Sequence, residues 1–507
     1  MRGFLSAALL SCALLACGSN HNGASVCDNV VPPPAACMTA CDPTPGAPNT
    51  CPGGYHCTPD GHCDAQCTPS GGECGDGFHC DTEGNCQEDG ACEGIQCNIT
   101  KCDTMSMPPT TITGTVFAPN GTLPLYGVQV YVPLHDVGPL PDGAVCSKCA
   151  DTPLGDPLVS DVTKEDGTFT LTNVPDGTDI PLVVVSGKWR RIIKIPTIAP
   201  CTTVPLAATE TTFPKSMTDM TATTVSVNMP KMAITTGNAD ALECLIRRMG
   251  VADSEITVGG GSGHVQLFHG NGASKIGNTS MPEAKTMWSS TDAMKAFDAV
   301  IFSCEGSQNP GNGKDKDAMA AVKAYADFGG RVFASHWHNV WIEGVENDNT
   351  NKPPAPWPSI ANWNNSNDTF DGDDLIDEVN NPKGMSFATW MLNVVPGSTR
   401  DHIAIGNQTG KNTINSVDTT KAEIWTTWPG KMFMGTVVPQ NFQFVTPAEG
   451  DPNNACGKVV FSDMHVGLGS TSSDPFPSGC STQPLSPQEK ALAFMLFDLS
   501  SCVGAIF

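Results

Sequence analysis

The sequence predicts a multidomain chain in which a disulfide-rich N-terminal segment is followed by a β-sandwich and then by a doubly wound α/β domain. Three observations predict this order. Thirteen cysteines lie between residues 27 and 102, alternating apolar and polar residues recur from about 111 to 206, and apolar strands alternate with helices from 232 onward. The length of 507 residues suits about three domains, at ~150 residues per domain.

The amino-acid composition indicates the type of cellular compartment and excludes one class of binding partner. The chain has 27 Lys and Arg against 52 Asp and Glu, which gives a formal net charge of −25. Because nucleic-acid binding needs a basic face, this balance excludes a nucleic-acid partner. The 23 cysteines are too many for a reducing cytosol and indicate an oxidising compartment.

Residues 1–16 have the pattern of a signal peptide. One positive charge precedes an apolar run from Phe4 to Leu15, which is too short to span a bilayer but suits a signal-peptide core. The run ends with Leu14-Leu15-Ala16-Cys17, which resembles a bacterial lipobox. The resemblance implies cleavage before Cys17, lipidation of Cys17, and attachment to the outer membrane, with periplasmic and surface display both left open. The alternative is an ordinary secretory signal.

Residues 17–30 are expected to form a tether, and residues 31–108 a cysteine-rich stalk. A 23-residue repeat is visible, because the spacing from Cys51 to Cys63 is repeated from Cys74 to Cys86. Aliphatic residues are too few for a core, so cross-links must replace burial. Zinc is the rival interpretation, but most cysteine gaps are five residues, whereas zinc sites show pairs two to four apart. The stalk is distantly similar to EGF-like modules.

Residues 109–208 are expected to form the β-sandwich. Ile112–Val116 and Val128–Val132 alternate as half-buried strands do, and Asp166-Gly167 marks a hairpin turn. This region resembles the carboxypeptidase regulatory-like domain. The resemblance rests on Gly114, Val116, Pro124, Gly127, Val128, Asp166, Gly167, Phe169, Leu171, Pro175 and Gly177. It implies a seven-stranded sandwich that acts as a non-catalytic spacer or binding module.

An insertion at about 133–158 carries Cys146 and Cys149. A Cys-x-x-Cys pair is compatible with redox chemistry or half of a zinc site. In an oxidising compartment, structural bridging is the favoured interpretation, with Cys201 as a candidate partner.

Residues 209–228 are expected to form a linker, and residues 229–507 the α/β domain with an insertion at about 340–430. Strands alternating with helices predict a doubly wound parallel sheet. The expected strands are 232–237, 255–258, 299–304, 331–335 and 458–462, and the expected helices are 239–249, 315–328 and 487–499.

Polar side chains gather where these strands end, which is where ligands bind in such sheets. They are Cys304, Glu305, Ser335, His336, His338, Asp463 and His465. We expect the three imidazoles to converge at one rim of the sheet.

The sequence from Gly329 to His336, together with Gly457–Phe461 and His465, resembles the ThuA-like family within the class I glutamine-amidotransferase-like, flavodoxin-like fold. Amidotransferases of this class place a cysteine nucleophile where this chain has Ser335 and His336, so glutamine hydrolysis is not expected. The whole arrangement resembles myxobacterial-type lipoproteins of unknown role. Some of these lipoproteins carry a tryptophan synthase label, but nothing in this sequence supports the barrel fold of that enzyme.

Three interpretations of the strand-end residues stay open. His336, His338, His465 and Asp463 have ligand atoms that suit zinc. Alternatively, one histidine with Glu305 or Asp463 moves a proton on a sugar. The third interpretation is a hydrogen-bonded structural cluster. Cys304 is either a nucleophile or a buried or bridged cysteine.

Tryptophans and acidic residues give two further hints. Seven of the nine tryptophans lie between Trp337 and Trp428, and Trp337 and Trp341 are candidates for stacking on sugar rings or for filling a core. The run from Asn367 to Asp374 has oxygen ligands for calcium but not the EF-hand spacing. Neither zinc nor calcium is assigned as a cofactor. Cys456 and Cys480 flank one loop and are the preferred disulfide pair.

The sequence therefore predicts a lipid-anchored cell-envelope protein that binds a carbohydrate or another envelope polymer, with no catalysis assigned. The alternatives are a carbohydrate-active hydrolase or isomerase that uses the strand-end histidines, and a purely structural envelope component.

Overall fold

A computed structural model describes residues 25–29, 35–44, 50–51, 55–65, 67, 78–80, 84, 86–88, 92, 94–102, 107–448, 454–467 and 469–504. The predicted signal peptide, Cys17 and Cys74 lie outside these residues. Across the described ranges, no helix is both long and apolar enough to traverse a bilayer. The chain divides into two compact units, residues 1–94 and 95–507.

The first unit is held by disulfides, as predicted. Its described elements are the helices α1 (Val26–Asn29) and η1 (Ala35–Met38) and the strands β1 (His56–Cys57), β2 (Cys63–Asp64), β3 (Phe78–Cys80) and β4 (Cys86–Glu88). β1 pairs with β2, and β3 pairs with β4, so each copy of the 23-residue repeat forms a short hairpin. The bonds in this unit include Cys27–Cys37, Cys41–Cys57, Cys51–Cys63 and Cys67–Cys80.

The second unit begins with two sheets that share one core. The strands are β5 (Thr111–Thr115), β6 (Gln129–Pro133), β7 (Pro157–Val162), β8 (Thr168–Thr172), β9 (Gly177–Ser186), β10 (Trp189–Ile198), β11 (Thr203–Pro205) and β12 (Thr224–Asn228). They form a five-stranded sheet of order β12-β10-β9-β6-β7 and a three-stranded sheet of order β11-β5-β8. Ile112 and Leu171 from the smaller sheet join Val130 and Val184 from the larger one in this core.

The segment predicted as a linker takes part in this packing. After α2 (Ala208–Thr211), it continues into β12, which pairs antiparallel with β10. Phe213 from the same segment is fully buried and stacks on Trp189. The threonine-rich composition predicted a linker, but the segment ends in the edge strand β12, whose sequence Thr-Val-Ser-Val-Asn is rich in β-branched residues.

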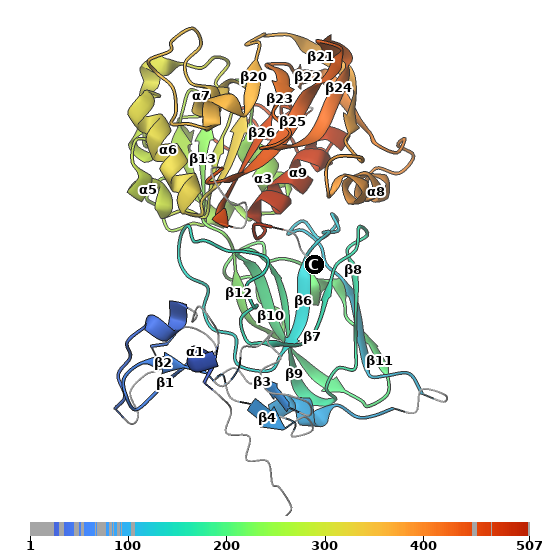
Figure 1. Cartoon of the computed structure of the whole chain (residues 1–507). Helices are drawn as coiled ribbons and strands as arrows, with labels where there is room; N and C mark the ends of the chain where they lie inside the picture. The colour runs from blue at the N-terminus through green and yellow to red at the C-terminus, as the bar shows by residue number, and fades with distance from the viewer. Residues whose placement is uncertain are drawn as a thin grey trace, which may run out of the picture. The chain divides into compact units, whose positions relative to one another are not determined.

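The rest of the second unit is built on a ten-stranded sheet of order β14-β15-β13-β18-β19-β26-β25-β24-β21-β22 (Figure 1). The first six strands are parallel: β13 (Met232–Thr236), β14 (Ile256–Val258), β15 (Val265–His269), β18 (Ala299–Phe302), β19 (Arg331–Ser335) and β26 (Gly457–Ser462). The last four are antiparallel: β21 (Thr369–Ile376), β22 (His402–Lys411), β24 (Glu423–Phe433) and β25 (Thr436–Thr446). The predicted parallel strands are present, and the predicted insertion supplies antiparallel strands that extend the sheet.

Helices cover both faces of this sheet (Figure 1). They are α3 (Leu242–Arg248), α4 (Lys285–Trp288), α5 (Thr291–Lys295), α6 (Lys316–Phe328), α7 (Val340–Glu343), α8 (Gly384–Val394) and α9 (Pro487–Ser500). In β19, Phe333 belongs to the apolar core that also contains residues of α3, α8 and α9, whereas Val332 and Ala334 belong to a separate core that contains residues of α6. Strands buried on both faces explain the uninterrupted apolar runs in the sequence.

Disulfides join the insertion at 133–158 to the end of the chain. Cys146 bonds to Cys456, and Cys149 bonds to Cys502. Cys201 bonds to Cys102, and Cys480 bonds to Cys244. The predicted Cys456–Cys480 pair and the suggested partnership with Cys201 are therefore wrong. Short distance along the chain favoured the first, but folding brings partners 310 and 236 residues away next to these two cysteines.

Close backbone contact also fixes the small sheets against the α/β part. Gly187 has a φ of 55°, and a Cβ at this position would collide with the backbone oxygen of Ser500 at the end of α9. Only glycine provides both the left-handed conformation and the space that this contact requires.

Glu243, in α3, gives a prediction for stability against pH. Its side chain is almost fully buried and accepts a hydrogen bond from Ser472, and burial raises its pKa to about 7. The folded chain therefore binds this proton more tightly than the unfolded chain does. The resulting stability is complete below the unfolded pKa near 4.5 and is lost as the pH rises through about 7.

We expect Glu243→Gln to match the wild type near pH 4 and to exceed its free energy of unfolding by ~3 kcal/mol at pH 8, at 1.36 kcal/mol per pKa unit. Urea denaturation of both proteins at the two pH values measures the difference. An equal difference at both pH values would contradict the buried, proton-binding role of Glu243.

Candidate functional site

The first candidate site is a buried cluster at the carboxyl ends of β18, β19 and β26. It consists of Cys304, His336 and His465, which are 0%, 3% and 4% exposed. His336 Nδ1 lies 3.4 Å from Cys304 Sγ, and the two imidazole rings are 5.1 Å apart between centroids. Parallel strands bring these three residues to one edge of the sheet, as the sequence predicted for His336 and His465.

His336 has a strained backbone. Its φ is 45°, in the left-handed region that few residues other than glycine adopt, although asparagine, aspartate and histidine enter it more often than the rest. Such a conformation costs on the order of 1–3 kcal/mol and persists only where the surrounding structure holds it in place. The turn directly after β19 places the ring beside Cys304 rather than letting it continue along the strand direction.

His338 does not join the other two histidines. Its ring stacks on Phe302, and its Nδ1 accepts a hydrogen bond of 2.8 Å from the Trp341 indole. Its Nε2 lies 3.8 Å from Glu305, which forms a fully buried ion pair of 2.8 Å with Lys314. The predicted convergence of all three imidazoles is therefore wrong for His338, because two residues further along the 3-10 turn the side chain enters the aromatic core instead.

Ser335 and Asp463, two other predicted site residues, hold the fold together. Ser335 donates a hydrogen bond of 2.6 Å to Asp240, whose other oxygen accepts from the backbone of Val466. Asp463 accepts from the backbone and hydroxyl of Thr413. These bonds attach β26 and its following loop to neighbouring segments, and Asp463 is not one of the residues whose ligand atoms cluster with the two histidines.

The electrostatics of the cluster favour neutral side chains. Burial raises the pKa of Cys304 to about 12, lowers the pKa of His336 to about 3, and lowers the pKa of His465 well below its usual value. A cysteine nucleophile has to be a thiolate, and a general acid or base has to exchange protons near neutral pH. As it stands, the cluster suits neither role.

The tryptophans predicted to stack on sugars are buried. Trp341 is fully buried between Trp288 and Phe302, so the stacking prediction is wrong for it. Trp337 is 6% exposed, and its indole donates to Asn367, so it presents no free ring face either. Both side chains fill the core at the strand ends, which was the alternative interpretation.

The acidic side chains of residues 367–374, which were considered as calcium ligands, point to different partners along β21. Asp368 pairs with Lys431, Asp371 accepts from the backbone of Gln408, Asp373 contacts His402, and Asp374 is buried beside Thr426. Within the described parts of the chain, these carboxylates do not form one of the clusters close enough to share an ion. Strand alternation sends successive side chains to opposite faces, which explains the separation.

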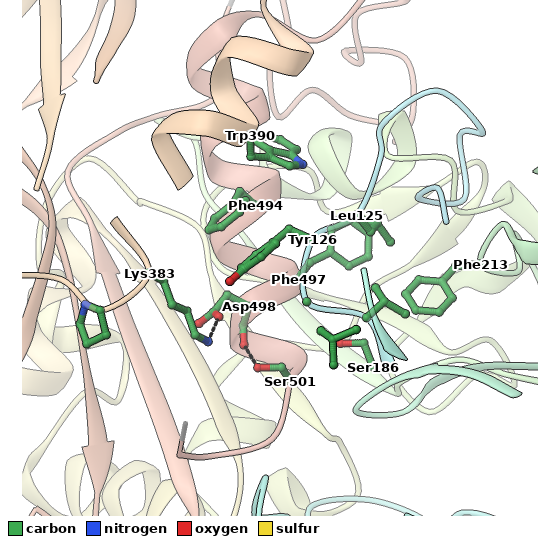
Figure 2. Close-up of a pocket in the computed structure, with 14 residues that line it drawn as sticks. Leu125, Tyr126, Ser186, Phe213, Lys383, Trp390, Phe494, Phe497, Asp498 and Ser501 are labelled. Carbon is green, nitrogen blue, oxygen red and sulfur yellow. Dashed lines mark hydrogen bonds and ion pairs between the residues drawn. The ribbon is translucent and has the colours of Figure 1, made fainter. Parts of the chain in front are cut away.

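The second candidate site is a cavity of about 270 Å³ that the sequence did not predict. It lies between the loop before β6, the helices α8 and α9, and the end of β9 (Figure 2). Its lining includes Tyr126, Phe213, Trp390, Phe494 and Phe497, with Leu125 and Val128. The Tyr126 ring lies parallel to Phe494, with ring centroids 6.2 Å apart.

Charged groups occupy one side of this cavity. Asp498 forms ion pairs with both Lys383 and Lys458, so two ammonium groups share one carboxylate. Figure 2 shows the Tyr126 hydroxyl pointing toward Lys383 and Asp498, with Ser501 next to them. The net charge of this group is +1, in a chain whose overall charge is −25.

The pKa shifts here follow from the shared carboxylate. Burial alone raises the pKa of Asp498, but the charges of Lys383 and Lys458 outweigh this effect and hold the pKa well below its usual range. Burial lowers the pKa of Lys458 to about 8 against the opposing effect of Asp498. Burial also lowers the pKa of Lys383, but Asp498 outweighs it and the pKa is raised. Lys383, whose side chain is 21% exposed, therefore stays charged and reaches the cavity.

One sequence signal could have located this cavity. Phe494, Phe497 and Asp498 follow a spacing of three and four residues, which puts an acidic side chain on the apolar face of the last helix. A charge on such a face indicates a buried partner. The sequence did not indicate which lysines would pair with it, because Lys383 and Lys458 lie 115 and 40 residues away.

The comparisons with known proteins give no family. No protein-family model matches the chain, and no curated protein matches it. Two solved structures with similarity are chains of type II cohesin–X-dockerin complexes from Acetivibrio cellulolyticus, one a C-terminal and one an N-terminal interface mutant. Each is 15% identical to this chain, and the TM-score is 0.15 in both cases. The matched region covers 26% of this chain and 78% or 79% of the other chain. No inference about fold or function is drawn from similarity at this level.

Proposed function

We propose that the protein is a lipid-anchored component of the cell envelope that binds a carbohydrate polymer in the aromatic cavity of residues 95–507. The observation that carries this proposal is the combination of aromatic walls with a charged group at one side of the cavity. Ligand sites are concave, mostly apolar, and contain a few polar groups that fix orientation. The volume, near the lower end of the usual ~300–1,000 Å³, suits one ring-sized unit.

The charge at the cavity favours an acidic unit. The Lys383 ammonium is paired with a carboxylate that Lys458 also neutralises, so it has hydrogen-bonding capacity left for a ligand acceptor. A carboxylate on a sugar ring would form a charge-assisted hydrogen bond with it. Tyr126 contributes a ring face and a hydroxyl on the same side (Figure 2). The proposed ligand is therefore a uronic acid or another acidic sugar within a polymer.

The rest of the chain fits this function. The lipobox-like sequence ending at Cys17 would attach the protein to the outer membrane, and the disulfide-bonded segment would separate the binding unit from the membrane. The resemblance of residues 109–208 to carboxypeptidase regulatory-like domains, and of residues 229–507 to the ThuA-like family with its flavodoxin-like fold, supports a protein acting on or binding envelope carbohydrates. The binding role is preferred to a hydrolase or isomerase because the strand-end histidines are buried.

Two substitutions test the cavity. Tyr126→Ala removes the ring face and is expected to weaken binding of acidic oligosaccharides ~10-fold, as the loss of ~1–1.5 kcal/mol of aromatic contact implies. Lys383→Met is expected to weaken binding ~10–100-fold, because a hydrogen bond to a charged group contributes ~1.5–3 kcal/mol. Lys383→Met leaves Asp498 paired with Lys458, so the fold is retained.

The measurement is a glycan array probed with the full chain, followed by calorimetric titration of the ligands that bind. The control is Lys421→Met, which removes a lysine paired with Asp418 on the surface, and it should bind like the wild type. Binding that is unchanged in both cavity variants would rule out this site. Equal binding of neutral and acidic glycans would rule out the proposed role of Lys383.

A further inference from the structure

The buried cluster of Cys304, His336 and His465 has the geometry of a metal site. Each residue offers one ligand atom, and the three atoms lie within 4.8 Å of one another. The 3.4 Å between Cys304 Sγ and His336 Nδ1 matches the edge of a tetrahedron around zinc, which is ~3.5 Å for Zn–S and Zn–N bonds of ~2.3 and ~2.0 Å. A thiol and two imidazoles are also the ligands that zinc prefers.

The imidazoles have nitrogen atoms without partners. The Nε2 atoms of His336 and His465 are buried without a hydrogen-bond partner, as is that of His338 outside the cluster, and both cluster histidines are at least 96% buried. Buried polar atoms in folded proteins nearly always have a partner, so an orphaned nitrogen needs an explanation. A bound ion would give each of the two imidazoles a further partner inside the buried cluster and would account for the left-handed turn that holds His336 beside Cys304.

The state of Cys304 is a second, independent indication. It is a free thiol, whereas every other cysteine within the described residues is disulfide-bonded. The other candidate cluster, Cys41, Cys51 and Cys63, is already used in disulfides. A thiol that stays reduced in a chain made for an oxidising compartment is protected by burial, and coordination would protect it further.

We propose that Cys304, His336 and His465 bind one zinc ion. On binding, the Cys304 S–H bond breaks, its proton leaves to solvent, and a Zn–S bond forms. Both histidines bind as neutral imidazoles, no electron is transferred, and one coordination position of the tetrahedron remains. Glu305, Lys314 and His338 form a separate buried group and do not take part.

The burial of the cluster determines how the ion enters. With all three side chains at most 4% exposed, zinc cannot reach them easily in the folded protein and must bind as the chain folds. The bound ion should therefore resist removal by a chelator under native conditions and be lost on unfolding.

The test measures zinc in the full chain produced by export into an oxidising compartment with zinc in the medium. After native dialysis against a chelator, elemental analysis is expected to find about one zinc per chain in the wild type. Cys304→Ser and His465→Gln should each lower this to below about a tenth. The matched control is His338→Gln, a buried histidine two residues from His336, which should retain the ion.

A second measurement, on the wild-type protein, tests the zinc site if the variants fail to fold. Wild-type protein refolded with cobalt(II) should show the intense thiolate-to-cobalt charge-transfer absorption of a cysteine-bound ion. The proposal is overturned if the wild type holds less than about a tenth of a zinc both as purified and after refolding with zinc. It is also overturned if the two ligand variants keep the wild-type amount, or if the cobalt protein lacks this absorption.

Discussion

Replacing Asp498 by asparagine is expected to lower the free energy of unfolding by ~3–5 kcal/mol, the cost of breaking a buried ion pair from one side. Asp498 is the carboxylate shared by Lys383 and Lys458, whose side chains are 21% and 4% exposed. Asparagine has nearly the same shape but no charge, so it would leave two buried or half-buried ammonium groups unbalanced. Lys458 would respond by losing its proton.

Urea denaturation of the full chain measures this effect. The control is Asp292→Asn, which removes a carboxylate that is 92% exposed and faces Lys295 on a helix surface, and which should change stability by no more than ~0.5 kcal/mol. If Asp498→Asn lowered the free energy of unfolding no more than the control does, then Lys383, Lys458 and Asp498 would not form an interdependent charged group. The proposed charged side of the cavity would then be wrong.

The second large effect concerns the two disulfides of the insertion at 133–158. Replacing Cys149 and Cys502 together by serine is expected to lower the stability of residues 95–507 by ~3–5 kcal/mol. With Cys146–Cys456 intact, this bond closes a further loop through residues 146–149 and 456–502, so it still restricts the unfolded chain. Removing Cys146–Cys456 in addition should lower stability further, because each bond closes a different loop.

The matched control is the double variant Cys27→Ser/Cys37→Ser. Its bond spans only 10 residues and lies in the first compact unit, so the unfolding midpoint of residues 95–507 should not change. Thermal unfolding, monitored by near-ultraviolet circular dichroism of the tryptophans in the α/β part, distinguishes the Cys149/Cys502 double variant from the Cys27/Cys37 double variant. Equal midpoints for both double variants would mean that the long-range bonds do not constrain the second unit.

The sequence predicted those elements whose burial is complete or regular. The runs at 299–304, 331–335 and 458–462 have uninterrupted apolar centres because helices cover both faces of their strands, and each corresponds to a strand of the sheet. The helix predicted at 315–328 by the glycines that follow it is present as α6, and the structure adds that the Asp315 side chain caps its first turn. These signals are local, so sequence alone contains them.

The antiparallel extension of the sheet could not be located in the same way. In β25, Gln440, Asn441 and Gln443 are buried among Phe442 and Phe444, so the alternation of apolar and polar residues that marks a strand is lost. Asn441 compensates by donating to Thr426 on the neighbouring strand β24. Such polar pairs depend on the register between neighbouring strands, which cannot be derived from the sequence alone.

The candidate site was predictable only in part, for the same reason. Strand order brings His336 and His465 together and adds Cys304, but the 3-10 turn after β19 decides that His338 faces Phe302 instead. The cavity joins Tyr126, Lys383 and Asp498, which are hundreds of residues apart, and no local pattern links them. Disulfide partners were missed because pairing depends on the folded arrangement.

Hydrogen–deuterium exchange of the full chain, with and without the acidic oligosaccharide that binds best on the array, tests the proposed binding site most directly. Binding in the aromatic cavity should slow exchange of backbone amides at 125–128 and around Lys383 and Trp390, which line it. Slowed exchange confined to the segments around Cys304 and His336, or no change in either region at saturating ligand, would show that the oligosaccharide does not bind in this cavity.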